Sequence, residues 1–125
     1  MATNNPSQPR SPIRTIDREE LRTKLARGDD FRLVMSGSDW SFRAKHLPAS
    51  VHFQTPDQMF GALRPDQEIV VYCSNADCHA SLGTIQKLLD HGYRDVRHYA
   101  GGLIDWETAG LPLEGEWASG PPAPL

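Results

Sequence analysis

The stretch that decides the fold runs from Glu68 to His91 and reads EIVVYCSNADCHASLGTIQKLLDH. Its first part, Ile69–Tyr72, is short, apolar and rich in β-branched residues, which is typical of a buried strand. From Leu82 onward, apolar residues recur at helical spacing. A small polar loop, which Cys73 opens, lies between the two. The sequence therefore predicts a strand, a loop and a helix, with a thiol at the carboxyl end of the strand.

The place of Cys73 at this junction predicts a reactive thiol. The backbone amides of the loop can converge on one point, and the helix N-terminus adds about half a positive charge. A free cysteine has a pKa of about 8.5, and a helix N-terminus can lower it to about 3.5–7.5. Because Asp77 opposes this shift, we expect a modestly lowered pKa and a nucleophilic thiolate. A buried, inert cysteine is the alternative, because free cysteines are often buried.

Further helices and strands alternate along the chain. Helices are predicted from Asp17 to near Gly28, with Asp17 and Glu20 as a capping box, over 58–63, from His79 or Ala80 to His91, and over 103–109. Strands are predicted over 31–35, 51–53, 69–72 and 96–99. This alternation predicts an α/β fold with a mainly parallel central sheet flanked by helices. One domain should span residues 13–114, between a disordered N-terminal tail (1–12) and a Pro/Gly-rich C-terminal tail (115–125).

The composition disfavours several classes of partner. The 125 residues hold 13 Lys and Arg against 16 Asp and Glu, a net charge of -3 with a pI near 5.9, which disfavours a nucleic-acid surface. No apolar stretch approaches the roughly 18 residues of a membrane-spanning helix, and the polar N-terminus lacks the apolar core of a secretory signal. We therefore expect a cytoplasmic protein without nucleic-acid or membrane partners. Its two cysteines should be kept reduced.

Five segments carry a set of motifs in a fixed order. They are Phe31–Val34, His46–Phe53, Ile69–Cys73, Leu88–Val96 and Gly101–Pro112, the last of which reads GGLIDWETAGLP. Together they resemble the rhodanese-like domain family of single-domain sulfurtransferases, whose C-terminal signature is G-G-x-x-x-W-x-x-x-G-x-P. The resemblance implies that Cys73 is the nucleophile, which takes a sulfane sulfur from a donor such as thiosulfate or a persulfide. It then hands this sulfur to a thiol, cyanide or protein acceptor, and no metal or organic cofactor is implied.

The same resemblance makes the loop after the cysteine the substrate-binding cradle of backbone amides. Its residues are Ser74, Asn75, Ala76, Asp77, Cys78, His79 and Ala80. Converging amides suit an anionic persulfide. His79 is the one potentially cationic residue of this loop, and it could orient a donor or serve only as a polar residue at the helix start.

Two departures from the family pattern bear on the substrate. The family often has Asp-x-Arg after its second strand, where this chain has Met35–Gly37, and here the active loop holds no Arg or Lys before Lys87. Thiosulfate is a dianion, so it should bind poorly relative to persulfide donors unless Arg43 or Lys45 supplies the missing charge. The departures keep open a second function, a non-catalytic rhodanese-like binding or regulatory module.

Cys78 lies five residues after Cys73 and suggests a third function, a thiol redox switch. Cys78 could attack a persulfide or sulfenic acid on Cys73 and form a disulfide, which we expect only under oxidant. A second small residue that points inward is the simpler interpretation. A zinc site that includes His79 is disfavoured, because a structural zinc needs four ligands and the other histidines are scattered.

Several other residues invite a structural interpretation. We expect His46 to bond the backbone of its own turn and Trp106 to fill the core. Trp40 and Phe42 could wall a pocket, but core packing is the expected role of Phe42. The pair Gly101–Gly102 should serve a backbone conformation that is closed to other residues.

Overall fold

A computed structural model describes residues 13–74 and 79–117. Within them a five-stranded sheet has the order β1-β5-β4-β2-β3, and every neighbouring pair of strands is parallel. The strands are β1 (Arg14–Thr15), β2 (Arg32–Met35), β3 (Ser50–Val51), β4 (Glu68–Tyr72) and β5 (Asp95–Tyr99). The predicted α/β fold with a mainly parallel sheet is confirmed. The predicted N-terminal tail, loop residues 75–78 and residues 118–125 lie outside the described residues.

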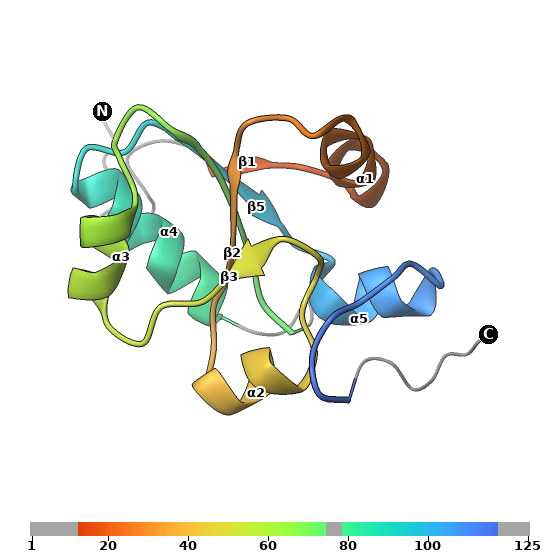
Figure 1. Ribbon diagram of the computed structural model, residues 1–125. Helices are drawn as coiled ribbons and strands as arrows, with labels where there is room; N and C mark the ends of the chain where they lie inside the picture. The colour runs from red at the N-terminus through yellow and green to blue at the C-terminus, as the bar shows by residue number, and fades with distance from the viewer. Residues whose placement is uncertain (1–12, 75–78, 118–125) are drawn as a thin grey trace, which may run out of the picture.

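The described part of the chain has five helices around this sheet. They are α1 (Arg18–Arg27), α2 (Asp39–Ala44), α3 (Pro56–Ala62), α4 (Ala80–Asp90) and α5 (Gly102–Thr108). Figure 1 shows α3 and α4 on one face of the sheet and α1 and α5 on the other, with α2 near its lower end. The sheet is therefore the middle layer of three.

Side chains of β4 alternate between these two layers of helices. Val70 and Tyr72 belong to one buried apolar cluster, which includes Trp106 of α5. The alternate side chains of the strand belong to a second cluster, which includes Ile85 of α4 and Met59 of α3. A strand covered on both faces must be apolar at every position, which is why β4 is the clearest strand signal in the sequence.

The boundaries of the elements follow local chemistry. Helix α1 begins as predicted, because the carboxylate of Asp17 accepts a hydrogen bond from the amide of Glu20 at 2.8 Å, and it ends at Gly28, whose φ is 71°. Neither β1 nor α2 is predicted from the sequence. Helix α2 is only six residues long and begins after Ser38, whose hydroxyl accepts from the amide of Ser41.

The last described residues lie against α2. The amides of Glu116 and Trp117 donate to the carbonyls of Arg43 and Ala44, each at 2.9 Å. The Trp117 ring meets the ring of Trp40 edge-on, with 5.2 Å between centroids. Contacts with the domain therefore continue past the predicted boundary at residue 114 as far as residue 117.

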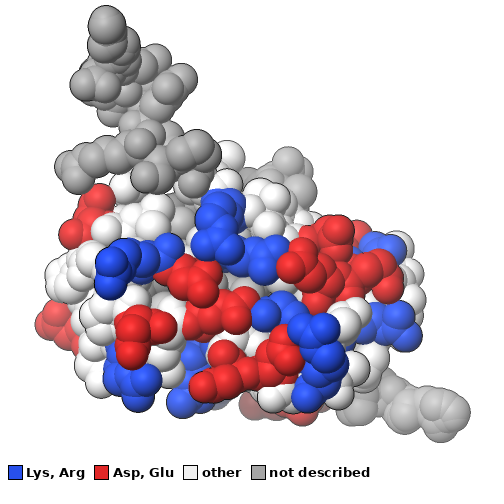
Figure 2. All heavy atoms as spheres, turned by 90° about the horizontal axis from the view of Figure 1, so that it is seen from above, with Lys and Arg blue, Asp and Glu red and all other residues white. Residues whose placement is uncertain are grey.

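The charged surface is mixed. Figure 2 shows the molecule from above, where Lys and Arg side chains are interleaved with Asp and Glu. Close ion pairs of the structure include Lys24–Glu68 at 2.6 Å and Arg97–Glu20 at 2.7 Å. In residues 13–74 and 79–117 we find no helix with the length and apolar character needed to cross a membrane.

Candidate active site

Cys73 directly follows β4 and is buried, with 2% of its surface exposed. The neighbouring strand β2 ends at the same level, because the amide of Ser36 donates to the carbonyl of Tyr72 at 2.8 Å. Gly37 comes next, and a Cβ built on it would lie 3.9 Å from Cys73 Sγ. Cys73 therefore lies at the carboxyl end of a central strand, as the sequence predicts, and the main chain at Gly37 lies beside its sulfur.

The start of α5 holds the base of the active loop. The amide of Leu103 donates to the carbonyl of Cys73, and the amide of Ile104 donates to the carbonyl of Ser74, each at 2.9 Å. These first amides of α5 are therefore used by loop carbonyls. Their role is to fix where the loop leaves the strand.

The two glycines before these amides have different reasons to be glycine. Gly102 has a φ of 70°, the left-handed conformation that favours glycine, as predicted. Gly101 has a φ of -62°, which any residue adopts. A Cβ on Gly101 would instead meet the side chain of Asp105 at 2.8 Å. For Gly101 the predicted conformational reason is wrong, and close packing replaces it.

The helix behind the loop is α4, which begins at Ala80. Its cap residue, His79, is exposed and makes no side-chain capping hydrogen bond. Of the predicted substrate cradle, the structure describes Ser74, His79 and Ala80. Asn75, Ala76, Asp77 and Cys78 lie outside the described residues. The cradle and the role of His79 therefore stay predictions, supported by the position of α4, whose positive dipole end lies at this loop.

Cys73 is disulfide-bonded in this structure, which is the oxidised state of the thiol. The chain holds one other cysteine, Cys78, which lies outside the described residues. A nucleophilic Cys73 requires the reduced state, because the thiolate is the attacking species. The reduced resting state stays a prediction.

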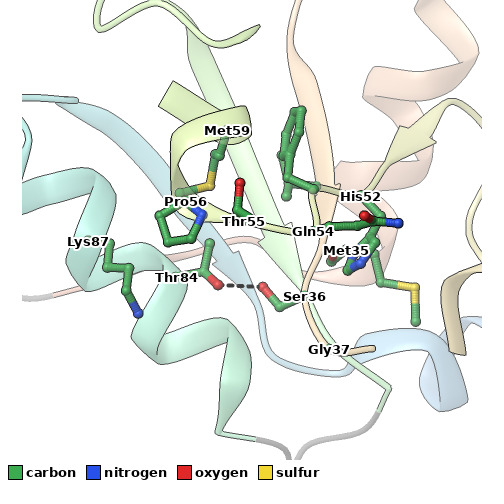
Figure 3. Close-up of a pocket in the computed structure, with 12 residues that line it drawn as sticks. Met35, Ser36, Gly37, His52, Gln54, Thr55, Pro56, Met59, Thr84 and Lys87 are labelled. Carbon is green, nitrogen blue, oxygen red and sulfur yellow. Dashed lines mark hydrogen bonds between the residues drawn. The ribbon is translucent and has the colours of Figure 1, made fainter. Parts of the chain in front are cut away.

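A pocket of about 120 Å³ opens beside Gly37, and the sequence analysis does not identify it (Figure 3). Its polar side chains include Ser36 after β2, His52 after β3, and Thr84 and Lys87 on α4. The Ser36 hydroxyl donates to Oγ1 of Thr84 at 2.8 Å, which ties the end of β2 to α4. The one sequence signal for this pocket is that Thr84 and Lys87 lie three residues apart in a predicted helix, which places them on the same face.

The ring of His52 is fixed at the rim of this pocket. Its Nδ1 lies 3.0 Å from the carbonyl oxygen of Met35, and the ring stacks on Phe42 with 5.5 Å between centroids. Because a carbonyl can only accept, Nδ1 carries the proton. His52 therefore holds the segment after β3 against the end of β2.

Lys87 differs from the two cations that the sequence analysis offers as replacements for a loop arginine. Arg43 is paired with Asp39 at 3.1 Å, and Lys45 with Glu107 at 2.6 Å. The side chain of Lys87 has no ion pair or hydrogen bond with any described residue. Among these three side chains, Lys87 is the cation available to a ligand.

The structural interpretations of the nearby aromatic and histidine residues mostly hold. Nδ1 of His46 lies 2.7 Å from the carbonyl of Phe42, which confirms the predicted bond to its own turn. Phe42 packs against the core cluster of Trp106, as expected. Trp106 itself is 2% exposed and donates to the carbonyl of Pro112 at 2.8 Å. Trp40 is exposed and does not line the pocket at Gly37.

Two buried tyrosines near the strand ends are structural. Burial raises the pKa of Tyr72 to about 12, although its oxygen lies 3.0 Å from the hydroxyl of Ser50. Burial also raises the pKa of Tyr99, and its hydrogen bond to Asp105 raises it further. Both phenols therefore stay protonated. Burial lowers the pKa of His98, so its neutral ring is favoured.

No group of three or more His, Cys, Asp or Glu side chains that could hold a metal occurs in the described ranges. The zinc site that the sequence disfavours would include Cys78, which lies outside the described residues.

Comparisons with known proteins agree on the domain type. The sequence model of the Rhodanese-like domain matches residues 17–109. A sulfurtransferase of Allochromatium vinosum is 27% identical over 104 residues, which cover 81% of this chain and 94% of that protein. The HTH-type transcriptional regulator Rv0324 of Mycobacterium tuberculosis is 28% identical over 106 residues, which cover 83% of this chain. The match covers 46% of that regulator, so the chain spans less than half of its length.

Solved structures share the fold. The Rhodanese-like domain of the Alr3790 protein of Anabaena superimposes with a TM-score of 0.77 at 21% identity, over 91% of this chain and 88% of that one. The human single-domain sulfurtransferase TSTD1 superimposes with a TM-score of 0.64 at 24% identity, over 78% of this chain and 97% of that one.

Proposed function

The chain belongs to the rhodanese-like domain family, and on that premise we propose that it is a sulfurtransferase that carries sulfane sulfur as a persulfide on Cys73. The observation that carries the proposal is the position of Cys73, which ends β4 and opens the loop before α4. Parallel sheets bind ligands beyond such strand ends. The similarity to a sulfurtransferase supports the reaction class.

The first half-reaction loads the sulfur. The reduced Cys73 thiolate attacks the outer sulfur of a donor, either a persulfide or thiosulfate, and a new S–S bond forms. The donor's own S–S bond breaks, and its electron pair leaves with the departing thiolate or sulfite. The product on the enzyme is an anionic persulfide, which the dipole of α4 and the predicted loop amides stabilise.

The second half-reaction transfers this sulfur to the acceptor. A thiolate or cyanide attacks the outer sulfur of the Cys73 persulfide and forms a new bond to that sulfur. The S–S bond to the enzyme breaks, and the electron pair returns to Cys73 as a thiolate. The product is a new persulfide or thiocyanate, and the two half-reactions together need no external oxidant or reductant.

The disulfide at Cys73 adds a requirement before the first turnover. A thiol reductant must attack the disulfide and release Cys73 as a thiolate. This observation favours one alternative function, a redox switch in which oxidation turns sulfur transfer off. The similarity to the regulator Rv0324 favours another alternative, a regulatory module, which the missing loop arginine also supports.

The charges around the site support persulfide donors over thiosulfate. Arg43 and Lys45 already bind carboxylates at 3.1 and 2.6 Å, so neither is free for the sulfonate oxygens of thiosulfate. A dianion is best held by a guanidinium or by several donors. We expect a higher kcat/KM for persulfide or polysulfide donors than for thiosulfate.

Mass spectrometry of the intact, reduced protein tests the function. After separate incubations with a polysulfide and with thiosulfate, we expect one added sulfur on Cys73. Cyanide should remove this sulfur as thiocyanate. Cys73→Ser should lose both the added sulfur and thiocyanate formation while its far-UV circular dichroism is unchanged, and Cys78→Ser should keep them. A folded protein that takes up no sulfur, or a Cys73→Ser variant that still transfers it, would refute the proposal.

A further inference from the structure

The pocket at Gly37 reaches a residue that lies next to the reacting sulfur, although Cys73 itself is not among the residues that line it. Gly37 lines the pocket, and a Cβ on it would lie 3.9 Å from Cys73 Sγ. The pocket's volume of about 120 Å³ far exceeds the roughly 10–15 Å³ that one water molecule needs by the same measure. A small organic group could therefore occupy the pocket with one end close to Cys73.

The charge at this pocket comes from Lys87. Figure 3 shows its side chain extending along α4 toward the turn that carries Thr84. Lys87 is exposed, and its side chain has no ion pair or hydrogen bond with a described residue, unlike the side chains of Lys24 and Lys45. An unpaired ammonium beside a pocket favours a ligand with a negative charge.

The hydroxyl groups of the pocket limit which anion fits. Ser36 donates its proton to Thr84, and Thr84 donates its own to the carbonyl of Ala80 at 3.1 Å. Both hydroxyl oxygens therefore offer lone pairs to a ligand, and these repel an anion but accept from an S–H or O–H group. Among Ser36, Thr84 and Lys87, only Lys87 can donate to a sulfonate with three charged oxygens, and the other donor groups of the lining belong to Gln54 and Thr55.

The remaining wall is apolar. Val34, Phe53 and Met59 line the pocket, and Pro56 lies at the start of α3 beside Met59 (Figure 3). A short hydrocarbon chain can pack on these side chains and gain from leaving water. The pocket thus combines a cation, hydrogen-bond acceptors and an apolar surface.

From this combination we propose that the pocket binds the sulfur acceptor and that this acceptor is a small aliphatic thiol with a carboxylate, which Lys87 binds. The proposal rests on the sulfur transfer proposed above and names the substrate class of that site. The carboxylate lies at Lys87, the hydrocarbon chain against Phe53 and Met59, and the thiol at the Gly37 end beside the Cys73 persulfide. The thiolate attacks the outer sulfur, and Cys73 leaves as a thiolate.

Binding can be tested without the reaction. Butyrate has the skeleton of 3-mercaptopropionate with a methyl group in place of the thiol. In an NMR titration of Cys73→Ser, butyrate should shift the amide signals of Ser36 and Thr84. In the double variant with Cys73→Ser and Lys87→Gln, butyrate should bind roughly five- to tenfold more weakly. This is the loss expected for one charge-assisted hydrogen bond at a partly exposed site.

Steady-state kinetics of the reduced protein test the assignment to the acceptor. With one polysulfide donor, Lys87→Gln should raise the KM for 3-mercaptopropionate roughly five- to tenfold and leave kcat nearly unchanged. The KM values for uncharged 2-mercaptoethanol and for the donor should not change. Arg94→Gln is the matched control, because Arg94 is exposed, has no described ion pair, and lies outside the pocket.

The two experiments separate failure of this proposal from failure of the proposed function. Butyrate binding that depends on Lys87 supports the carboxylate site even if no persulfide forms. Absence of butyrate binding, or an equal loss with Arg94→Gln, overturns it even if sulfur transfer occurs. It is also overturned if Lys87→Gln raises the KM for 2-mercaptoethanol or for thiosulfate as much as that for 3-mercaptopropionate.

Discussion

Two hollows lie at the carboxyl edge of the sheet, and they differ in how their charges are satisfied. The larger, about 590 Å³, lies at the ends of β1 and β5 and is lined by Arg18, Tyr99 and Asp105. There Asp105 accepts from Arg18 at 2.9 Å and from Tyr99 at 2.5 Å. The smaller, about 120 Å³, lies at the ends of β2 and β3 and has the unpaired Lys87.

The difference shows that the size of a hollow does not indicate its role. The charges of the larger hollow bind one another and fix α1 and α5 to the sheet. In the smaller hollow the ammonium of Lys87 has no partner among residues 13–74 and 79–117, while the neighbouring sulfur is the predicted nucleophile. We therefore assign a structural role to the charged groups of the larger hollow and a binding role to the smaller one.

The largest effect should come from removing the buried side chain that anchors α5, the helix that carries Asp105 of the larger hollow. Trp106→Ala should destabilise the protein by about 3–5 kcal/mol, because it leaves a cavity in the core. Chemical denaturation with fluorescence and circular dichroism measures this. Trp117→Ala is the control, since Trp117 is 59% exposed and its contact with Trp40 contributes about 0.5–1.5 kcal/mol. Equal losses in the two variants would contradict the assigned burial.

A second change tests the wall between the small hollow and Cys73. Gly37 has a φ of 114°, so Gly37→Ala should cost about 1–3 kcal/mol of backbone strain. Its new methyl group would also lie 3.9 Å from Cys73 Sγ, so acceptor turnover should fall. Gly83→Ala is the control, because Gly83 lies in α4 with nothing within 4 Å of a Cβ. The free energy of unfolding of Gly83→Ala should rise by about 0.5–1 kcal/mol. A Gly37→Ala variant as stable as Gly83→Ala would contradict the backbone strain assigned to Gly37.

A third change separates the two hollows directly. Asp105→Ala leaves the buried hydroxyl of Tyr99 and the guanidinium of Arg18 without their acceptor, and should cost about 1–2 kcal/mol. The KM for a carboxylated thiol should not change, because Asp105 lines the other hollow. Asp66→Ala removes an exposed pair with Arg64 and should change stability by less than about 0.5 kcal/mol. A raised KM in Asp105→Ala would refute the separation.

The smallest effect concerns pH. Burial lowers the pKa of His98, whose Nε2 lies 2.8 Å from the Ser81 hydroxyl oxygen. Because the folded pKa lies below the unfolded value of about 6.5, the folded state binds fewer protons just below that pH. The contribution of His98 is therefore complete above about pH 6.5 and is lost as the pH falls toward the folded pKa. Urea midpoints at several pH values should drop more steeply in the wild type than in His98→Gln, and parallel curves would contradict this.

The sequence alone was sufficient for the parts of the fold that depend on local pattern. β4 is covered on both faces and is therefore a continuous apolar run, and α4 has a regular apolar stripe. By contrast, β1 is two residues long and exists through its pairing with β5, so no local pattern marks it. Helix α2 has six residues, too few for a clear period, and only the cap at Ser38 signals it.

The candidate site divides in the same way. The sequence determined that Cys73 ends a buried strand before a helix, because a strand pattern, a polar loop and a helical pattern follow one another without a gap. Only the tertiary structure decided which side chains line the pocket at Gly37. Ser36 and His52 follow two different strands and Lys87 comes from a helix, and parallel pairing of the strands brings their carboxyl ends to one edge. It also decided which cations are available, because Arg43 and Lys45 pair with carboxylates while Lys87 pairs with none in the described part of the chain. A pattern along the chain reports the neighbours of a residue in sequence, whereas pairing of charges depends on distances that only folding sets.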